Sequence, residues 1–349
     1  MYSHSSPIVE KAVLLDKANR PLQDLRVSVI DRCNLRCPYC MPQGSFGHAY
    51  KFLNPSEWLT FDEIETLVCM CVDMGVSKVR ITGGEPLLRP NLPDLIRRLK
   101  KIEGIEDLAL TTNGILLAAH AGQLKDAGLD RLTVSLDSLD ENVFKKMSGG
   151  AGTLRTVLRA IDCAQKAGFF PLKFNCVVQR GINDHTILDM VEHFRGSGHI
   201  LRFIEYMDVG NQNHWDFKNV VPSGEIISRI HKKFPLRLLE RNYSSETSER
   251  YGFVDGAGEI GFVSSVTRAF CGTCTRLRLS ADGKFYTCLF ANQDLDVRSV
   301  LREGTSGKSV EETIRQMWLQ RGDHYSEIRL REGLEHPRHK KVEMFQIGG

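Results

Sequence analysis

Between residues 25 and 205, six short strand-like runs alternate with amphipathic stretches. The spacing of roughly 25–50 residues between runs is typical of repeated βα units around a parallel sheet. Six units are too few for a closed eightfold barrel. A partial (βα)6 TIM-like barrel and an open parallel sheet both fit this spacing. The expected strands are Leu25–Ile30, Lys78–Thr82, Leu108–Thr112, Leu132–Leu136, Lys173–Val178 and Leu201–Glu205, and the helical patterns cover Thr60–Met74, Leu92–Ile102, Leu116–Ala127, Thr153–Ala167 and Asp184–Arg195.

The alternation ends near Gly210. The following segment, Gly210–Phe217, is polar and rich in asparagine, which is typical of a linker or loop. We therefore predict an N-terminal extension over residues 1–24, an α/β domain over 25–210 and a smaller C-terminal domain over 211–349. The elements expected in the C-terminal domain are Leu236–Leu239, Ile260–Val263, Arg276–Ser280 and a helix near Ser309–Gln320.

The composition excludes several classes of function. A net charge of +3 is too small to indicate a nucleic-acid or membrane surface. No apolar run approaches the ~18–20 residues of a membrane span, and residues 1–26 lack the apolar core of a secretory signal. The expected location is the cytoplasm, where structural disulfides are rare. Clustered cysteines among the ten of this chain therefore indicate metal binding or catalysis.

The first cluster of cysteines follows the first predicted strand directly. Cys33, Cys37 and Cys40 have the spacing C-x3-C-x2-C, and so short a loop can present three thiolates to one iron–sulfur cluster. The fourth iron then has no protein ligand and is open to a small molecule, by the logic of a metal site with an open position. A closed zinc site with His48 as its fourth ligand is the alternative.

This cysteine loop, directly after a first β-strand, resembles the radical S-adenosylmethionine (SAM) superfamily. The resemblance implies a [4Fe–4S] cluster on the first cysteine group and SAM on its open iron, from which a 5′-deoxyadenosyl radical arises. The turn Gly83–Pro86, with the sequence Gly-Gly-Glu-Pro, resembles the superfamily's site for the amino group of SAM. Its glycines let the backbone approach a ligand closely. The residues that the resemblance implies as SAM contacts are Tyr39, Gly84, Thr111, Ser135 and Met207.

A second group, Cys271, Cys274 and Cys288, has the spacing C-x2-C-x13-C and no obvious fourth cysteine. Three ligands again suggest a cluster with an open iron, here free to hold a substrate. Arg276 and Arg278 lie two residues apart on a predicted strand, so their side chains point to the same face. Two guanidinium groups together suit a multiply charged anion, whereas a solvated strand face is the simpler alternative.

Five further basic residues lie on or beside the predicted strands. A charge that faces the core of a parallel sheet is costly unless it meets an opposite charge. Acids such as Asp31, Glu85 and Glu205 can neutralise some of them, but cations on several strands can also form one electropositive cavity. The set therefore predicts an anionic substrate with several phosphates. Its members are Arg26, Lys78, Arg80, Lys173 and Arg202.

Four segments together resemble the GTP 3′,8-cyclase family of molybdenum cofactor biosynthesis, and the resemblance covers nearly the whole chain. They are Cys33–Pro42, the Gly-Gly-Glu-Pro turn, Cys271–Gly283 and Ile347–Gly349. The resemblance implies two [4Fe–4S] clusters, SAM as cofactor and GTP as substrate. The 5′-deoxyadenosyl radical would abstract the ribose C3′ hydrogen, and the C3′ radical would then attack C8 of guanine. Reduction of the resulting aminyl radical, with uptake of a proton, would give (8S)-3′,8-cyclo-7,8-dihydro-GTP.

The same resemblance implies roles for single residues. Gly348 and Gly349 are small enough to enter a crowded active site, and the family places them there together with Arg276 and Arg278 as catalytic residues. Thr275 departs from the asparagine expected after the second cysteine of that block. The implied GTP contacts are Arg26, Lys78, Arg80, Lys173, Arg202, Arg276 and Arg278.

The resemblance also implies partners. These are an electron donor and a downstream cyclic pyranopterin monophosphate synthase, and a homodimer is left open. One rival interpretation is a zinc protein without enzymatic activity. Another is a radical SAM enzyme that modifies a peptide and uses the second cluster as an auxiliary electron carrier. Such auxiliary clusters usually have a fourth cysteine ligand, which is not evident here.

Overall fold

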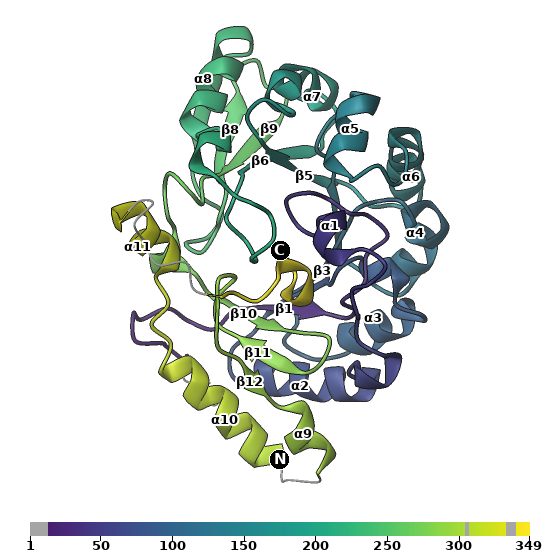
Figure 1. The fold of residues 1–349 in the computed structure, drawn as a ribbon, viewed down its shortest axis with the longest axis vertical. Helices are drawn as coiled ribbons and strands as arrows, with labels where there is room; N and C mark the ends of the chain where they lie inside the picture. The colour runs from purple at the N-terminus through teal and green to yellow at the C-terminus, as the bar shows by residue number, and fades with distance from the viewer. Residues whose placement is uncertain (1–12, 304–306, 333–339) are drawn as a thin grey trace, which may run out of the picture.

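The computed structural model describes residues 13–303, 307–332 and 340–349. At its centre lies a sheet of parallel strands (Figure 1). All six strands expected from the alternation are present, with small shifts at their ends. They are β1 (Asp24–Ser28), β2 (Lys78–Thr82), β3 (Asp107–Thr112), β4 (Arg131–Ser135), β5 (Lys173–Val178) and β6 (Ile200–Glu205).

The chain after residue 210 extends this same sheet at both edges. β10 (Arg276–Leu279) pairs parallel with β1, and β9 (Glu259–Val263) pairs parallel with β6, so eight parallel strands adjoin. Antiparallel strands follow on each side: β11 (Lys284–Tyr286) and β12 (Leu295–Asp296) beyond β10, and β8 (Glu249–Phe253) and β7 (Leu236–Leu239) beyond β9. The order is β12-β11-β10-β1-β2-β3-β4-β5-β6-β9-β8-β7. Among the described residues the sheet is open, and the expected mixed α/β fold is confirmed.

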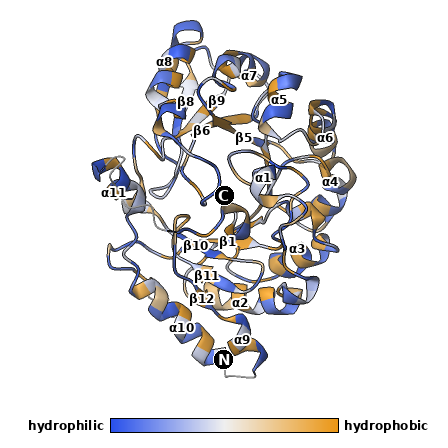
Figure 2. Ribbon diagram, in the orientation of Figure 1, coloured by the Kyte–Doolittle hydropathy of each residue, from blue (hydrophilic) through white to orange (hydrophobic). Residues whose placement is uncertain are grey.

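Helices that follow the parallel strands lie around the outer side of the sheet (Figure 1). α3, for example, buries Leu92, Leu95, Ile96 and Leu99, which lie on one helical face. The same helices carry both hydrophobic and hydrophilic residues in Figure 2, as expected for elements with one buried face. The helices of this part are α1 (Gln43–Phe46), α2 (Phe61–Asp73), α3 (Leu92–Lys100), α4 (Leu117–Asp126), α5 (Glu141–Met147), α6 (Leu154–Lys166) and α7 (Ile187–Phe194).

Local side chains determine where several of these helices begin. At the start of α2, Thr60 Oγ1 accepts from the backbone of Glu63, whose carboxylate accepts from the backbone of Thr60. The side chains of Asp140 and Thr153 accept hydrogen bonds from backbone N–H groups in the first turns of α5 and α6, without the reciprocal bond. Such caps satisfy backbone N–H groups that have no partner within the helix, so these starts can be read from the sequence.

The C-terminal part returns to the middle of the molecule. Figure 1 shows the C-terminus near the centre of the view, beside β1, and α12 contacts that strand. None of the described helices combines the length and hydropathy that a membrane span requires. The domain boundaries at residues 24 and 210 stay predictions, and residues 1–12 of the expected extension lie outside the described residues. The helices of this part are α8 (Ser223–Lys233), α9 (Arg298–Arg302), α10 (Gly307–Leu319), α11 (Tyr325–Glu332) and α12 (Met344–Ile347).

Candidate active site

The inner face of the sheet carries a row of arginines. Arg278 of β10 is paired in register with Arg26 of β1, and Arg26 is paired with Arg80 of β2. Paired residues on neighbouring strands project from the same face of a sheet. The three guanidinium groups therefore lie side by side, and like charges so placed repel one another.

A second row lies two residues earlier on the same strands. In it, Arg276 and Lys78 flank Asp24, which is paired with both. Lys78 Nζ also lies 3.4 Å from the ring centroid of Tyr243, a cation–π contact. One carboxylate thus stands among five basic side chains in the two rows, and this wall of the sheet is strongly positive.

Burial and mutual repulsion lower the pKa values of several basic residues on the strands of this sheet. Burial, together with the charges of Arg80 and Arg131, lowers the pKa of Arg202 to about 10. Burial also lowers the pKa of Arg278 to about 10. In the same way, burial and the charge of Arg202 lower the pKa of Lys173 to about 8. An anion that brings negative charge to such a group relieves this repulsion.

Within the described residues, none of the seven predicted cations forms an ion pair with an aspartate or a glutamate, whereas neighbouring arginines do. Arg131 pairs with Asp107, and Arg20 and Arg321 both pair with Asp16. The arginines that pair with aspartate stabilise the fold, whereas the seven predicted cations remain available to a ligand. The available ones are Arg26, Lys78, Arg80, Lys173, Arg202, Arg276 and Arg278.

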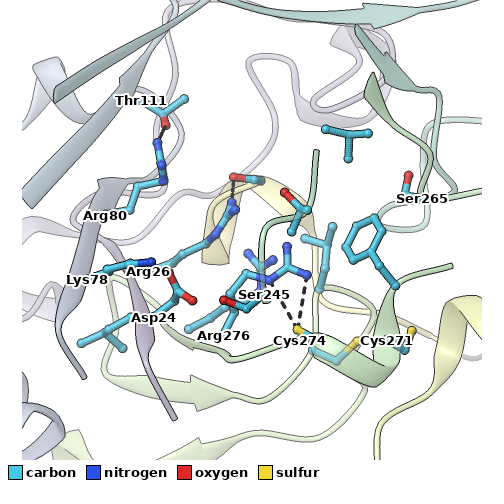
Figure 3. Close-up of a pocket in the computed structure, with 18 of the residues that line it drawn as sticks. Asp24, Arg26, Lys78, Arg80, Thr111, Ser245, Ser265, Cys271, Cys274 and Arg276 are labelled. Atoms are coloured by element: carbon cyan, nitrogen blue, oxygen red, sulfur yellow. Dashed lines mark hydrogen bonds between the residues drawn. The ribbon is translucent and has the colours of Figure 1, made fainter. Parts of the chain in front are cut away.

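Most of the available cations line one cavity together with the second cysteine group. Figure 3 shows Arg276 beside Cys274 and Cys271 at the edge of this space. Lys173 does not line the cavity, but it lies close enough to Arg202 for their charges to interact. The predicted residues that line the cavity are Arg26, Lys78, Arg80, Thr111, Arg202, Met207, Cys271, Cys274, Arg276, Arg278, Cys288 and Gly349.

The thiols of Cys271, Cys274 and Cys288 are all free. Arg276 donates through Nε and Nη2 to Cys274 Sγ, at 3.3 Å in each case (Figure 3). Burial acts to raise the pKa of the Cys274 thiol, but Arg276 and Arg321 more than offset it and lower this pKa to about 6. Burial raises the pKa of the Cys288 thiol to about 12. Three free thiols, one of them held as a thiolate, fit the ligand set of an iron–sulfur cluster.

The first cysteine group also consists of free thiols, and its members lie close enough for their charges to interact. Burial raises the pKa of the Cys33 thiol to about 11, and it raises the pKa values of Cys37 and Cys40 as well. A bound metal supplies the positive charge that deprotonates such thiols. No three Cys, His, Asp or Glu side chains in the described residues are grouped to hold a single metal ion.

The Gly-Gly-Glu-Pro turn packs directly against the first cysteine loop. A Cβ atom on Gly84 would lie 2.2 Å from the carbonyl oxygen of Arg32. Gly83 has φ +153°, and a Cβ atom there would lie 2.5 Å from the carbonyl oxygen of Ile30. Both glycines are thus required for the contact between turn and loop, which the sequence pattern did not indicate.

Glu85 of this turn connects two strands to the cysteine loop. Its buried carboxylate accepts from Thr112 Oγ1 at 2.7 Å and from the backbone N–H of Asn113 at 2.8 Å. Asn113 Nδ2 in turn donates to Asn34 Oδ1 at 2.7 Å and lies 3.7 Å from Cys33 Sγ. Burial raises the pKa of Glu85 to about 7. These contacts orient the loop relative to β2 and β3.

Two of the predicted SAM contacts lie beside the first cysteine group. Tyr39 and Met207 pack in one hydrophobic cluster with Cys37 and Cys40. The hydroxyl of Tyr39 donates to Asp137 Oδ2 at 2.9 Å, which fixes the orientation of its ring. An aromatic and a thioether side chain are therefore in place next to the thiols.

Thr111 and Ser135, two further predicted SAM contacts, lie elsewhere. Thr111 Oγ1 accepts from Arg80 Nη1 at 3.2 Å and lines the cavity with the cations. Ser135 is paired in register with Asn175 at the end of β4 and does not line the cavity, although Asn175 does. The structure thus brings Thr111 next to Arg80 and leaves Ser135 out of the cavity lining.

The last described residues lie between the two cysteine groups. Phe345 of α12 packs in a cluster with Cys33 and Cys40. Ile347, two residues later, packs with Cys288 of the second group. A segment of only a few residues therefore connects the surroundings of both groups.

Gly348 and Gly349 contact the row of arginines. Arg278 donates to the carbonyl oxygen of Gly348, and Arg26 donates to a backbone oxygen of Gly349. Gly348 has φ +69°, and a Cβ atom on it would lie 1.8 Å from Thr82 Oγ1. Because L side chains rarely adopt this conformation and the space is filled, only glycine fits here.

The loop after β6 anchors this segment. Lys341 Nζ donates to Asp208 Oδ2 at 2.7 Å. Asn211 Nδ2 donates to the carbonyl oxygen of Lys341 at 2.6 Å and to Glu343 Oε1 at 2.8 Å. The loop that carries Met207 therefore also holds the segment that carries the two final glycines.

The sequence analysis missed several polar residues of the cavity. In the described residues, Asn175 Oδ1, Ser245 Oγ and Ser265 Oγ are buried without a hydrogen-bond partner, so they are available to a polar ligand. Asn175 lies two residues after Lys173 on a predicted strand, and the alternation of faces could have identified it. Ser245 and Tyr243 lie in a loop whose sequence carries no comparable signal.

Thr275 stands where the resemblance leads us to expect asparagine, and it has a structural role. It is 3% exposed, and its hydroxyl donates to the carboxylate of Asp24. Its carbonyl oxygen accepts from the backbone of Gln23 and Asp24 at 3.2 and 3.1 Å. The residue therefore joins the beginnings of β1 and β10.

Two family models match the chain. Residues 27–194 match the radical SAM superfamily, and residues 199–327 match the family described as Molybdenum Cofactor Synthesis C. The first match contains the first cysteine group, and the second match contains the second group, Cys271, Cys274 and Cys288. Together the two models cover most of the parallel sheet.

Several proteins named GTP 3′,8-cyclase are similar to this chain over nearly their full length. The chain is 53% identical over 343 residues to the GTP 3′,8-cyclase of Xanthomonas campestris pv. campestris (strain B100), covering 98% of this chain and 99% of the relative. It is 47% identical to the GTP 3′,8-cyclase of Acidothermus cellulolyticus, covering 96% and 98%. Identity to the GTP 3′,8-cyclase of Staphylococcus epidermidis (strain RP62A) is 44%, covering 97% and 100%.

Solved structures with a similar fold are more distant in sequence. Streptococcus suis SuiB bound to precursor peptide SuiA matches with a TM-score of 0.60 at 14% identity, covering 95% of this chain and 71% of that one. Native anSMEcpe with bound AdoMet matches with a TM-score of 0.54 at 16% identity, covering 82% of each chain. At this identity the likeness concerns the fold alone.

Proposed function

This chain belongs to the GTP 3′,8-cyclase family of the radical SAM superfamily, and we propose that it converts GTP to (8S)-3′,8-cyclo-7,8-dihydro-GTP in molybdenum cofactor biosynthesis. The superfamily implies a [4Fe–4S] cluster and SAM, which when bound supply the 5′-deoxyadenosyl radical that abstracts the ribose C3′ hydrogen. We assign that cluster to Cys33, Cys37 and Cys40. The residues assigned to SAM are Tyr39, Gly84, Thr111, Ser135 and Met207.

The observation that carries this proposal is that six cations without an aspartate or glutamate partner line one cavity with three free thiols, and that Lys173 lies beside it as a seventh cation. A triphosphate carries several negative charges, and guanidinium and ammonium groups bind it through charge-assisted hydrogen bonds. The cations therefore suit the phosphate end of GTP. We assign a second [4Fe–4S] cluster to Cys271, Cys274 and Cys288, where an open iron would hold the guanine.

The protein's own part in the reaction is to position the reactants. Arg276 and Arg278 are the members of the basic rows that lie on β10, just after Cys274, so they can contact a substrate held by the rows and the second cysteine group. Gly348 and Gly349 lie against Arg278 and Arg26 and limit the space from the side of the first cysteine group. A radical that is poorly aligned reacts at the wrong atom, and such confinement directs it.

Two partners follow from this proposal. An electron donor must reduce the first cluster, and a cyclic pyranopterin monophosphate synthase must consume the product. A cytoplasmic location suits both clusters, since thiols stay reduced there. The peptide-modifying alternative is disfavoured because the relatives at 44–53% identity are GTP cyclases, whereas the likeness to SuiB rests on fold.

One experiment tests the proposed reaction directly. The reconstituted protein is incubated anaerobically with SAM, dithionite and GTP that carries deuterium at C3′, and the products are identified by mass spectrometry. We expect an isomer of GTP with an additional ring, together with 5′-deoxyadenosine that has gained the deuterium. A triple Cys33→Ala, Cys37→Ala, Cys40→Ala variant is the matched control and should form neither product. Deuterium-free 5′-deoxyadenosine alongside unchanged GTP would refute the proposal.

A further inference from the structure

A buried network of three charged residues lies behind the second cysteine group. The side chain of Asp16 is 0% exposed, and those of Arg20 and Arg321 are each 1% exposed. Asp16 Oδ2 accepts from Arg20 Nε at 2.6 Å and from Arg321 Nη1 at 3.3 Å. One carboxylate thus joins two guanidinium groups that come from opposite ends of the described chain.

Each guanidinium group also holds the backbone of a cysteine. Arg20 Nη1 donates to the carbonyl oxygen of Cys271 at 2.9 Å, and Arg321 Nη1 donates to that of Cys274 at 2.7 Å. Asp16 contacts neither cysteine itself. The network therefore binds the cysteine loop at two carbonyl groups. The carboxylate of Asp16 connects the two guanidinium groups that bind them.

The cysteine loop has few other regular restraints. Cys271 begins a single 3-10 turn, Cys271–Thr273, and regular β pairing starts only at Arg276. Hydrogen bonds from charged donors are stronger than neutral ones, particularly where water is excluded. The two arginine contacts thus fix the backbone of Cys271 and Cys274 and thereby orient their side chains.

Removing one member of such a network leaves the others buried and charged without compensation. Asp16 pairs with both arginines, and Arg321 also pairs with Asp323 at 3.2 Å. Loss of Asp16 would therefore loosen both contacts to the cysteine loop, and that of Arg20 with Cys271 most strongly. Arg20 and Arg321 also line the cavity that contains the three thiols. A disturbance here would reach the second cysteine group first, while the contacts of the first group, which involve Asn113 and Phe345, are separate.

We propose that Asp16, Arg20 and Arg321 are positioning residues for the second iron–sulfur cluster, which they hold through the carbonyl groups of Cys271 and Cys274. This inference rests on the proposed function, since it requires a cluster on the second cysteine group. It gives residues 13–22, which lie outside the βα repeat, a role in the active site. None of the three residues belongs to a cysteine, SAM or GTP motif of the sequence.

The test uses two backgrounds that each retain one cluster. In the second-only background, Cys33, Cys37 and Cys40 are replaced by Ala, and in the first-only background Cys271, Cys274 and Cys288 are replaced. Asp16→Asn is introduced into each full-length protein. After anaerobic reconstitution, the rate of iron loss to a chelator is measured, and the electron paramagnetic resonance spectrum of the reduced cluster is recorded.

We expect Asp16→Asn to accelerate iron loss at least ~10-fold in the second-only background, because both carbonyl contacts loosen, and to change the spectrum of that cluster. In the first-only background the rate and spectrum should stay the same, which shows that the protein is folded. Asp107→Asn breaks another arginine–aspartate pair of the cavity, that with Arg131, and is the matched control. It should change neither cluster.

Equal rates and spectra with and without Asp16→Asn in the second-only background would overturn the inference. If Asp16→Asn also releases the first cluster, the fold has failed, and Arg321→Lys decides instead. Lysine keeps the charge but cannot reproduce the separate contacts of Arg321 with Asp16, Asp323 and Cys274. Acceleration confined to the second cluster then supports the inference, and no acceleration refutes it. Failure of the parent second-only background to bind iron would instead refute the proposed second cluster.

Discussion

Arg278 donates a hydrogen bond to the carbonyl oxygen of Gly348, and this contact joins the last residues of the sequence to the arginine row of the sheet. Arg278 is 2% exposed, and its register partner Arg26 makes the equivalent contact with Gly349. Two of the cations that we assign to GTP therefore also hold this segment. The position of the glycines and the binding of substrate are connected through the same guanidinium groups.

Gly348→Val should leave a folded, two-cluster protein that forms little cyclised product. A valine side chain would collide with Thr82 Oγ1 and would strain a backbone with φ +69°. The segment would then withdraw from the arginine row, although the hydrophobic core contains no atom of Gly348. The measurement is product formation by mass spectrometry, together with iron content and melting temperature of the same preparation.

Deletion of Gly348 and Gly349 is the companion variant and should be at least as damaging to product formation. Deletion removes no apolar side chain, so the melting temperature should change little. Gly224→Val is a suitable control, because a Cβ atom there meets nothing within 4 Å. Full cyclisation by the truncated protein would rule out a catalytic role for the two glycines.

Arg276→Ala and Arg278→Ala should each weaken GTP binding or turnover by roughly 10–150-fold. One charge-assisted hydrogen bond to phosphate contributes about 1.5–3 kcal/mol. The affinity for GTP is measured by calorimetry, and the turnover in the cyclisation assay. Arg98→Ala removes an exposed arginine that pairs with Asp62 on the surface, and it should behave as the unaltered protein. Unchanged affinity and turnover in both Arg276→Ala and Arg278→Ala would contradict the assignment.

Anaerobic reconstitution should yield about eight irons per chain, four in each [4Fe–4S] cluster. Replacing Cys33, Cys37 and Cys40 by Ala should remove about half of this iron and abolish reductive cleavage of SAM. The equivalent replacement of the second cysteine group should remove the other half. Iron content and 5′-deoxyadenosine formation are the measurements. Stoichiometric zinc without iron uptake would refute the two-cluster interpretation.

Binding of inorganic triphosphate near pH 8.5 should take up a proton at Lys173. Burial and the charge of Arg202 lower the pKa of Lys173 to about 8, so the free protein holds it mostly neutral at this pH. A neighbouring polyanion favours the charged form and raises that pKa. Calorimetry in two buffers with different ionisation enthalpies measures the uptake. Lys173→Met should remove it, and identical buffer dependence in both proteins would contradict the prediction.

The lowered pKa of Lys173 also predicts that the free energy of unfolding depends on pH in the absence of ligand. Because the folded-state pKa of Lys173 lies below the ordinary value of 10.5, the unfolded chain binds more protons between pH 8 and that value. The free energy of unfolding therefore gains a contribution from Lys173 as the pH rises through this window. Urea unfolding of the unaltered protein and of Lys173→Met, compared at pH 7.5 and 9.5, isolates this contribution. A difference between the two proteins that does not change with pH would contradict it.

Much of the fold could be predicted because its signals are local. The strand Lys78–Thr82 has the bounds that the alternation of apolar and polar residues indicated, and the capping residues Thr60 and Thr153 mark helix starts within the sequence itself. The spacing of the cysteines is local in the same sense, because a short loop keeps three thiols near one another. Such features depend on neighbours in the chain and need no knowledge of distant contacts.

The tertiary structure alone decided which distant residues meet. That β10 pairs with β1, and thereby aligns Arg278 with Arg26, follows from packing across some 250 residues of chain and has no local signature. The collision that excludes a side chain from Gly84 is with a carbonyl oxygen of another loop. The sequence by itself therefore determined the residue types and the strands that carry them, because short-range periodicity encodes both. Only the folded sheet determined that cations, thiols and final glycines share one cavity, since long-range register places them there.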